Sequence, residues 1–349
     1  MPESQQIFPF NVKDASQAEY AALNRHNNIL RRERLPDDPP IPLDEMIQGM
    51  HNIPSFVDVK MWCIWNSPQT EIIAQGNVVL QHTPENQHIT QIDITVLPAH
   101  RRQGLARQLL ALVTEAAHID NRRLLFIESY DRAPGGEAFL TRLGAKKGIE
   151  AHTNQLRLEE LDRSLVERWL AKGKSLAGEF ELDLWEGPYP EEQINAVIQL
   201  YELGNQVPLG DLELEEAHMT PERLRQSEQM LFARGYQRWT CYVVEKATGK
   251  FAGYTETVWN PNRPEVLLQD MTGVFPEYRN RGLGRWLKAA MLDKILKERP
   301  GVKFVRTGNA DTNAAMLKIN NELGFKPYMA STFWQVEIER VQTYLGETQ

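Results

Sequence analysis

Apolar residues follow two different spacings along the second half of the chain. Short apolar or alternating runs, typical of strands, occupy residues 180–185, 239–245, 251–259, 266–274, 302–307 and 332–338. Longer segments carry apolar residues three or four positions apart, as amphipathic helices do, at residues 190–203, 220–235, 283–297 and 313–324. This order of elements predicts a mixed sheet with helices on both faces, that is, an α/β or α+β domain.

Local signals support these boundaries. Thr220 suits the N-cap of the 220–235 helix, Pro221 suits its first turn, and Gly235 stands just after its end. The stretch K-A-T-G-K between residues 245 and 251 contains turn-forming residues, so the flanking runs are expected to form a hairpin.

The first half repeats the pattern, less clearly in its opening third. Matching residues recur 178 positions apart in the same order: Cys63 and Cys241, Val96 and Val274, Pro98 and Pro276, and Arg101 and Arg279. The chain is therefore read as two copies of one unit. The small, polar segment 171–178 is the expected seam, which gives an N-terminal domain at 1–172 and a C-terminal domain at 179–349.

Composition and charge narrow the functional classes. The formal net charge of −8 disfavours general binding to nucleic acid or to an anionic membrane. Two cysteines and scattered histidines offer neither a disulfide framework nor a metal-binding spacing, so no metal is expected. There is no signal-peptide pattern and no apolar run long enough to span a membrane, and we expect a cytoplasmic protein.

A glycine-containing loop carries the clearest chemistry. Residues 276–288 read P-E-Y-R-N-R-G-L-G-R-W-L-K, and they join a predicted strand to a predicted helix. Free N–H groups and the dipole at a helix start attract anions, glycines let the backbone approach a ligand, and arginines suit phosphate. Alone, the segment is equally compatible with a basic, solvated helix start. A Walker A loop and a complete Rossmann pattern are both missing from the sequence.

The loop and its surroundings resemble the GNAT superfamily of N-acyltransferases. R-N-R-G-L-G is similar to the acyl-CoA loop of that family, V-F-P-E-Y precedes it as in the family, and N-A-D-T-N-A-A-M-L-K-I-N-N-E-L-G-F is similar to the family's later helix. The resemblance covers most of the second copy and reaches the first at R-R-Q-G-L-A. Two tandem domains are similar in layout to the double-domain members of the family, such as those of the mycothiol-synthase type.

The resemblance implies acetyl-CoA or another acyl-CoA as co-substrate. It implies that the pyrophosphate is held by the loop, that the pantetheine arm pairs with the preceding strand, and that Asn313 lies near the thiol end. Asn313 also suits a helix start, and Asn309 also suits a core or cap role. The cofactor-binding residues expected on this basis are Thr272, Gly273, Val274, Arg279, Asn280, Arg281, Gly282, Leu283, Gly284, Arg285, Asn309 and Asn313.

Acyl transfer to an amine needs a base, an oxyanion donor and a proton for the leaving thiolate. Asp270, an acidic residue in the run L-L-Q-D-M-T-G-V, is the first candidate for the base, and Glu256 is the second. Both also suit solvent-facing strand positions. The resemblance implies an oxyanion donor in the backbone near Val274. It also implies a tyrosine as acid where this chain has Asn320, so Tyr328 is the alternative acid.

The first copy departs further from the family. Arg102, Gly104 and Ala106 match the loop and could bind cofactor. However, Ala133 and Leu140 stand at the positions of Asn313 and Asn320. We therefore expect this copy to be a degenerate or structural partner.

The sequence thus predicts an N-acetyltransferase that acts on a primary amine of a small molecule by direct attack in a ternary complex. Two alternatives stay open: a non-catalytic acyl-CoA sensor and a protein N-acetyltransferase. We expect a monomer with two pseudo-symmetric domains, and no nucleic-acid or membrane partner.

Overall fold

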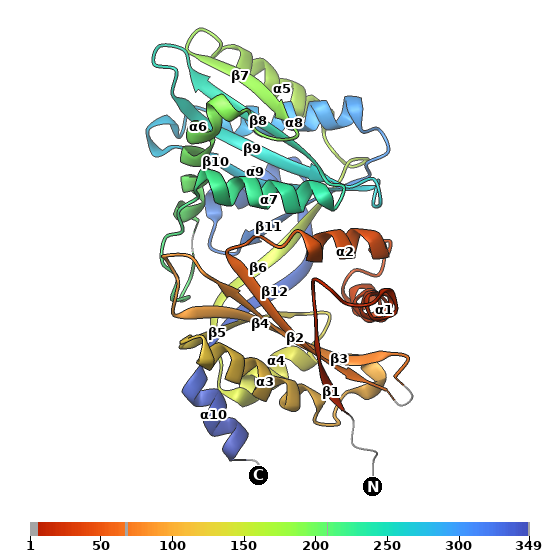
Figure 1. The fold of residues 1–349 in the computed structure, drawn as a ribbon. Coiled ribbons are helices and arrows are strands. Elements are labelled where there is room, and N and C mark those ends of the chain that lie inside the picture. The colour runs from red at the N-terminus through yellow and green to blue at the C-terminus, as the bar shows by residue number, and fades with distance from the viewer. Residues whose placement is uncertain (1–5, 67–68, 208, 348–349) are drawn as a thin grey trace. The chain divides into compact units, whose positions relative to one another are not determined.

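The computed structural model describes residues 6–66, 69–207 and 209–347. The chain forms two compact units (Figure 1). Unit 1 contains Met1–Glu150, Leu209–Glu215 and Met329–Gln349, and unit 2 contains Ala151–Pro208 and Glu216–Tyr328. Each unit is a mixed sheet with helices on both faces, which confirms the expected α/β class.

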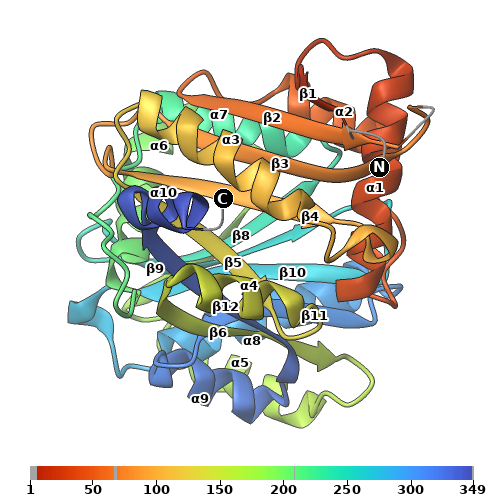
Figure 2. The same cartoon turned by 90° about the horizontal axis from the view of Figure 1, so that it is seen from below.

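Unit 1 is built on six strands that pair in the order β1-β2-β3-β4-β5-β12. Their bounds are β1 Ile7–Phe10, β2 Val57–Trp65, β3 Ile72–Gln81, β4 Ile89–Val96, β5 Leu124–Tyr130 and β12 Lys326–Glu337, of which residues 329–337 lie in this unit. The helices are α1 Gln17–Arg34, α2 Leu43–His51, α3 Leu105–Ile119, α4 Gly135–Leu143 and α10 Ile338–Gly346. Figure 2 shows α3 lying across β2, β3 and β4.

Unit 2 repeats the design, with strands in the order β6-β11-β10-β9-β8-β7. These strands are β6 Lys146–Arg157, of which residues 151–157 lie in this unit, β7 Phe180–Glu186, β8 Gln237–Glu245, β9 Phe251–Trp259, β10 Val266–Val274 and β11 Phe304–Ala310. The helices are α5 Arg163–Lys174, α6 Ile194–Tyr201, α7 Pro221–Ala233, α8 Leu283–Glu298 and α9 Ala314–Leu323. Figure 1 shows α6 and α7 on one face of β8–β10, and α5 and α8 on the other.

The halves of the chain exchange their last strands. Residues 331–337 of β12, from the second half, pair antiparallel with β5 of unit 1. Residues 151–157 of β6, from the first half, pair antiparallel with β11 of unit 2. The two sequence copies therefore do not coincide with the two compact units, because each unit takes one strand from the other copy.

The expected seam at 171–178 overlaps the end of α5, which continues to Lys174. Gly173 allows this helix to pack closely on α8. A Cβ built on Gly173 would lie 2.2 Å from Cδ1 of Trp286, far inside the contact distance. The glycine that looked like part of a linker is thus a packing residue, and α5 belongs to the core of unit 2.

The local predictions in the second half hold well. Thr220 caps α7 through a bond from the Arg223 N–H, and Gly235 follows the helix with a φ of 80°. The 266–274 strand is found with the expected ends. The last strand begins earlier, at Lys326, than the expected residue 332.

Candidate functional site

The strands β10 and β11 open away from each other in the middle of the unit 2 sheet. Their parallel pairing covers only Val266–Phe304, Leu267–Val305 and Leu268–Arg306. Beyond Leu268 the register between β10 and β9 also shifts, so that β10 carries one extra residue between Gln269 and Thr272. A bulge of this kind disrupts the ladder and bends the strand, and it lies just past the point where β10 leaves β11.

The glycine loop follows β10 and delivers the chain to the start of α8. Asn280 and Gly282 have φ values of 62° and 91°, in the left-handed region where glycine is favoured. Gly282 is the N-cap of α8, and no side chain caps this end. The first N–H groups of α8 therefore keep their capacity for an external anion, as the sequence predicted for a pyrophosphate.

The loop arginines have protein partners of their own. Arg279 donates from Nε to the Val274 carbonyl at 3.1 Å and from its guanidinium to Gln206. Arg281 pairs with Glu179, and Arg285 makes two bonds to Glu322, at 2.7 and 2.8 Å. Direct contact with a phosphate would therefore fall mainly to the backbone from Asn280 to Gly284.

The strand end before the loop is tightly packed. Thr272 is buried, and its hydroxyl lies 2.7 Å from that of Thr255. A Cβ on Gly273 would lie 2.9 Å from Cδ1 of Leu203, in the short helix η3 Glu202–Gln206. Val274 pairs with Gly253 of β9. This packing fixes the position of the backbone at which the resemblance implies the oxyanion donor.

Asp270 lies at the bulge, at the mouth of the gap between β10 and β11. Its side chain reaches solvent, yet the surrounding protein partly desolvates the carboxyl and raises its pKa, against the opposing effect of a bond from the Met271 N–H. A carboxylate with a raised pKa suits a general base.

Glu256, the second candidate base, is buried inside a hydrogen-bond network. Its Oε2 accepts from the hydroxyls of Tyr189 and Thr240 and lies 3.7 Å from Nε of Arg238. Burial raises the pKa of Glu256, and the Arg238 charge opposes the shift. With three partners on one oxygen, this carboxylate is committed to its network with Tyr189, Thr240 and Arg238.

Asn320, at the position implied for the acid, is fully enclosed. Its amide donates to Oδ1 of Asn309 at 2.8 Å, and its own Oδ1 accepts from Nζ of Lys288 at 2.9 Å. Asn309 also accepts from Asn154 at 3.3 Å. Both asparagines therefore brace α9 against β11 and α8, which matches the core role left open for Asn309.

The remaining candidates lie at the edges of this region. Asn313 is the N-cap of α9 and accepts from the Met316 N–H at 3.3 Å. Tyr328 ends unit 2, and the guanidinium of Arg306 lies 4.3 Å from the centroid of its ring. Asn313 thus caps a helix, and its contact with the cofactor stays a prediction.

Two buried residues next to the site were not singled out from the sequence. Tyr189 is held against Glu256, and Lys288 is fully buried in α8. Burial lowers the pKa of Lys288 to about 7. The burial of Lys288 could have been expected from its spacing from Leu292 and Ile295, which puts it on the apolar stripe of the helix.

The loop of unit 1 has the same backbone. Arg102 and Gly104 have φ values of 63° and 81°, and Gly104 is the N-cap of α3, again without a side-chain cap. Arg101 repeats the brace of Arg279, because its Nε donates to the Val96 carbonyl at 3.1 Å. Ala106 stands where unit 2 has Gly284, at which a Cβ would meet neighbours only at ordinary contact distances of 3.5 and 3.8 Å.

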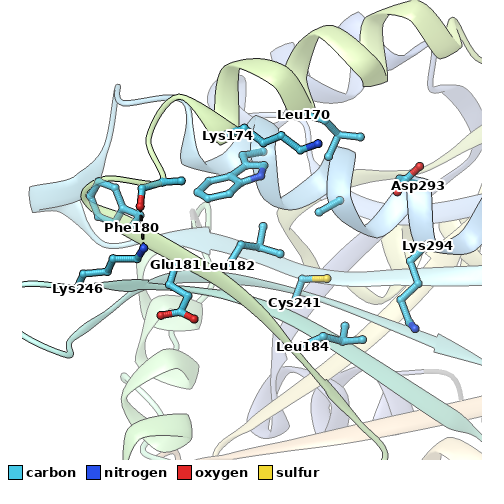
Figure 3. Close-up of a pocket in the computed structure, with 13 residues that line it drawn as sticks. Leu170, Lys174, Phe180, Glu181, Leu182, Leu184, Cys241, Lys246, Asp293 and Lys294 are labelled. Carbon is cyan, nitrogen blue, oxygen red and sulfur yellow. Dashed lines mark hydrogen bonds between the residues drawn. The ribbon is translucent and has the colours of Figure 1, made fainter.

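A separate cavity of about 470 Å³ lies among α5, β7, β8 and α8 of unit 2 (Figure 3). Leu170, Leu182, Leu184 and Cys241 line it with apolar surface, and Lys174 and Lys294 stand at its rim. Burial raises the pKa of the Cys241 thiol to about 12, so this cysteine is unreactive. Neither β10 nor β11 contributes to the cavity, so it is separate from the opening at Asp270.

Within the described ranges, no group of three or more His, Cys, Asp or Glu side chains is arranged to hold a metal ion. None of the described helices combines the length and apolar character needed to cross a bilayer.

Comparison with known proteins adds to this geometry. The profile described as the acetyltransferase (GNAT) family matches residues 25–144 and 210–325, more than half of the chain. No curated protein sequence matches the chain.

Several solved structures are similar in fold. A tandem GNAT protein from the clavulanic acid biosynthesis pathway has a TM-score of 0.76 at 24% identity, covering 96% of this chain and 99% of that one. A GCN5-related N-acetyltransferase from Sphaerobacter thermophilus has a TM-score of 0.64 at 12% identity, covering 95% and 96%. A GCN5-related glucosamine N-acetyltransferase region of a fungal multi-domain enzyme has a TM-score of 0.64 at 13% identity, covering 96% of this chain and 38% of that one.

Proposed function

The chain belongs to the acetyltransferase (GNAT) family, and from this premise we propose that unit 2 transfers an acyl group, acetyl in the simplest case, from acyl-CoA to a primary amine of a small molecule. The observation that carries the proposal is the placement of Asp270. It lies at the opening between β10 and β11, on the strand that leads directly into the uncapped start of α8.

The residues of unit 2 fit the family's co-substrate. The backbone from Asn280 to Gly284 offers N–H groups to a pyrophosphate, and the free edge of β10 past Leu268 offers hydrogen bonds to an extended amide-containing arm. When bound, acyl-CoA supplies an activated thioester carbonyl.

In the proposed reaction, Asp270 removes a proton from the acceptor ammonium so that a neutral amine can attack the carbonyl carbon. The C–N bond forms and the nitrogen gives up a second proton, the C–S bond breaks, and the thiolate leaves and takes up a proton, which gives an amide, a free thiol and one net proton released. Backbone N–H groups near Val274 would stabilise the oxyanion. Asn320 has no proton to give, so we assign the final protonation to Tyr328 or to water.

A small acceptor is favoured by the packing on the α6 and α7 face of the sheet. The short helix η3 lies against Gly273, and Tyr189, Leu200, Leu203 and Tyr254 form a closed apolar cluster there. Such close packing favours an acceptor amine of limited size over a peptide. Monomeric behaviour remains our expectation.

The test replaces Asp270 with asparagine, which keeps the shape of the side chain. Purified protein is incubated with acetyl-CoA and a panel of amines (putrescine, spermidine, lysine and tyramine), and thiol release is followed. Loss of a general base is expected to lower kcat/KM by about 10²- to 10⁴-fold. The raised pKa of Asp270 also predicts that wild-type activity falls as the pH drops through that pKa, a limb that D270N loses.

Binding of acetyl-CoA to D270N should stay as tight as in the wild type, because the carboxylate lies outside the loop.

One observation favours a second function, an acyl-CoA sensor: Asn320 replaces the implied acid, and its Oδ1 accepts a hydrogen bond from Lys288. Tight acetyl-CoA binding by the wild type with no amine-dependent thiol release would support the sensor and overturn the transferase.

A further inference from the structure

Unit 1 contains the same opening in its sheet as unit 2. Its β4 and β5 pair in parallel only at Ile89–Leu124, Thr90–Leu125 and Gln91–Phe126. The corresponding three pairs of unit 2 end at Leu268–Arg306. Gln91 of β4 and Leu268 of β10 are therefore equivalent positions, each the last one before the strands separate.

This structural register reveals a counterpart for Asp270. Asp270 lies two residues past Leu268, and Asp93 lies two residues past Gln91. The 178-residue offset between the copies instead matches Asp270 with Ile92. The bulge explains the difference, because β10 gains one residue between Gln269 and Thr272, whereas β4 pairs with β3 without a break from Gln91 to Val96.

A second carboxylate faces Asp93 across the opening. Since Gln91 and Phe126 are directly paired in parallel strands, Asp93 and Glu128, each two residues further on, point to the same face. Tyr130 donates from its hydroxyl to Oε2 of Glu128 at 2.6 Å. Unit 2 has Gly308 and Ala310 at the positions of Glu128 and Tyr130, so this group belongs to unit 1 alone.

The surroundings of these carboxylates suit a positively charged ligand. The Asp93 residue is exposed, yet the surrounding protein partly desolvates its carboxyl and raises its pKa, with the Arg34 charge acting against this shift and the Glu128 charge acting with it. The guanidinium of Arg34 lies 4.6 Å from the centroid of the Tyr130 ring, so one cation is already accommodated there.

A buried amide oxygen supports this view independently. Gln75 of β3 is only 6% exposed, and its Oε1 has no hydrogen-bond partner among the described residues. Gln75 pairs with Thr95, and its neighbour Asn77 pairs with Asp93, so all four side chains lie on one face of the sheet. A buried acceptor without a donor is costly, and the N–H groups of an amine would satisfy it.

The departures that made unit 1 look degenerate lie outside this group. Ala133 and Leu140 match Asn313 and Asn320 by sequence. In unit 2, however, Asn313 caps α9 and Asn320 is enclosed against Lys288 and Asn309. Their replacement therefore removes supports of a helix and leaves the opening between β4 and β5, the loop at Gly104 and the carboxylates in place.

We propose that unit 1 is a second acyl-transfer site, in which Asp93 takes a proton from a cationic amine acceptor and Glu128, Tyr130 and Gln75 bind that amine. The reaction type rests on the function proposed for unit 2. The amine nitrogen forms a bond to the thioester carbonyl carbon, the C–S bond breaks, and the thiolate leaves and is protonated. One proton per turnover passes through Asp93 to solvent.

The first measurement counts acetyl-CoA molecules bound per chain by isothermal titration. Gln103→Glu places a negative charge in the loop of unit 1, and Arg281→Glu does so at the matching position of unit 2. We expect two acetyl-CoA per wild-type chain and one for each variant. Arg281→Gln, which installs the residue found in unit 1, should retain two. If the wild-type chain binds one acetyl-CoA and R281E binds none, the proposal is overturned.

The second measurement assigns the chemistry to unit 1. The R281E chain should still release thiol with acetyl-CoA and an amine of the same panel, and adding Asp93→Asn should lower that rate by about 100-fold or more. In the Q103E chain, D93N should have no effect on the rate and D270N should abolish it. A failure of the function proposed for unit 2 is therefore seen separately from a failure of the second site in unit 1. The catalytic assignment is overturned if two molecules bind per wild-type chain but the R281E chain releases no thiol. It is also overturned if the R281E chain releases thiol at a rate that D93N does not change.

Discussion

Lys288 illustrates how one buried charge couples stability to pH. Its Nζ has Asn320 as hydrogen-bond partner, and burial lowers its pKa to about 7. An unfolded lysine has a pKa of about 10.4, so between these values the unfolded chain binds more protons than the folded one. Stability contributed by this residue therefore rises with pH in that window, by about 2 kcal/mol between pH 7 and pH 9.

Replacing Lys288 with methionine should remove this dependence. The free energy of unfolding, measured in urea at both pH values, is expected to rise with pH by about 2 kcal/mol more in the wild type than in K288M. Lys297→Met is the matched control, because Lys297 lies on the same helix with a side chain 69% exposed. Equal pH slopes for the wild type and K288M would show that Lys288 stays charged in the folded protein.

At the scale of single elements, Gly282 and Gly284 in the loop before α8 can be tested against each other. Gly282 has a φ of 91° with open space around its Cβ position, so an alanine there would fit but would be strained. A non-glycine residue in the left-handed region costs about 1 to 2 kcal/mol. We expect G282A to weaken acetyl-CoA binding to unit 2 several-fold, as measured by titration of a Q103E chain.

Gly284→Ala is the control for this change. A Cβ at Gly284 has neighbours at ordinary contact distance, and unit 1 carries Ala106 at the same position. G284A should therefore bind acetyl-CoA like its parent. If G282A and G284A behave alike, the left-handed backbone of Gly282 is not what shapes the anion site.

Elements could be predicted where the signal is local. Thr220, Pro221 and the loop at Gly282 act through bonds within a few residues, so the sequence located both helix starts. The bulge at Asp270 depends on pairing with a neighbouring strand, and nothing in L-L-Q-D-M-T-G-V reveals it. For this reason Asp270 could be selected from the sequence, whereas the 178-residue offset points to Ile92 and not to its counterpart Asp93.

At the scale of the whole molecule, the exchange of strands was also beyond the sequence. The strands β6 and β12 end equivalent copies, so either could complete either sheet by its pattern of apolar residues. The structure pairs residues 331–337 with β5 and residues 151–157 with β11. Such a choice is set by long-range packing, which local patterns do not encode.

This exchange predicts how the chain responds to division at residue 178. A fragment of residues 1–178 would lack the strand that pairs with β5, and a fragment of residues 179–349 would lack the one that pairs with β11. Each would expose an unpaired strand in its sheet, which favours aggregation. We expect neither fragment alone to be a monomer with cooperative thermal unfolding. The two co-expressed fragments should co-purify and bind acetyl-CoA.

The intact chain, cleaved at a protease site inserted after Gly178, is the control, and its two pieces should stay associated. A 179–349 fragment that is monomeric, unfolds cooperatively and binds acetyl-CoA as the full chain does would mean that strand β6 is dispensable and that the repeat boundary is also the folding boundary.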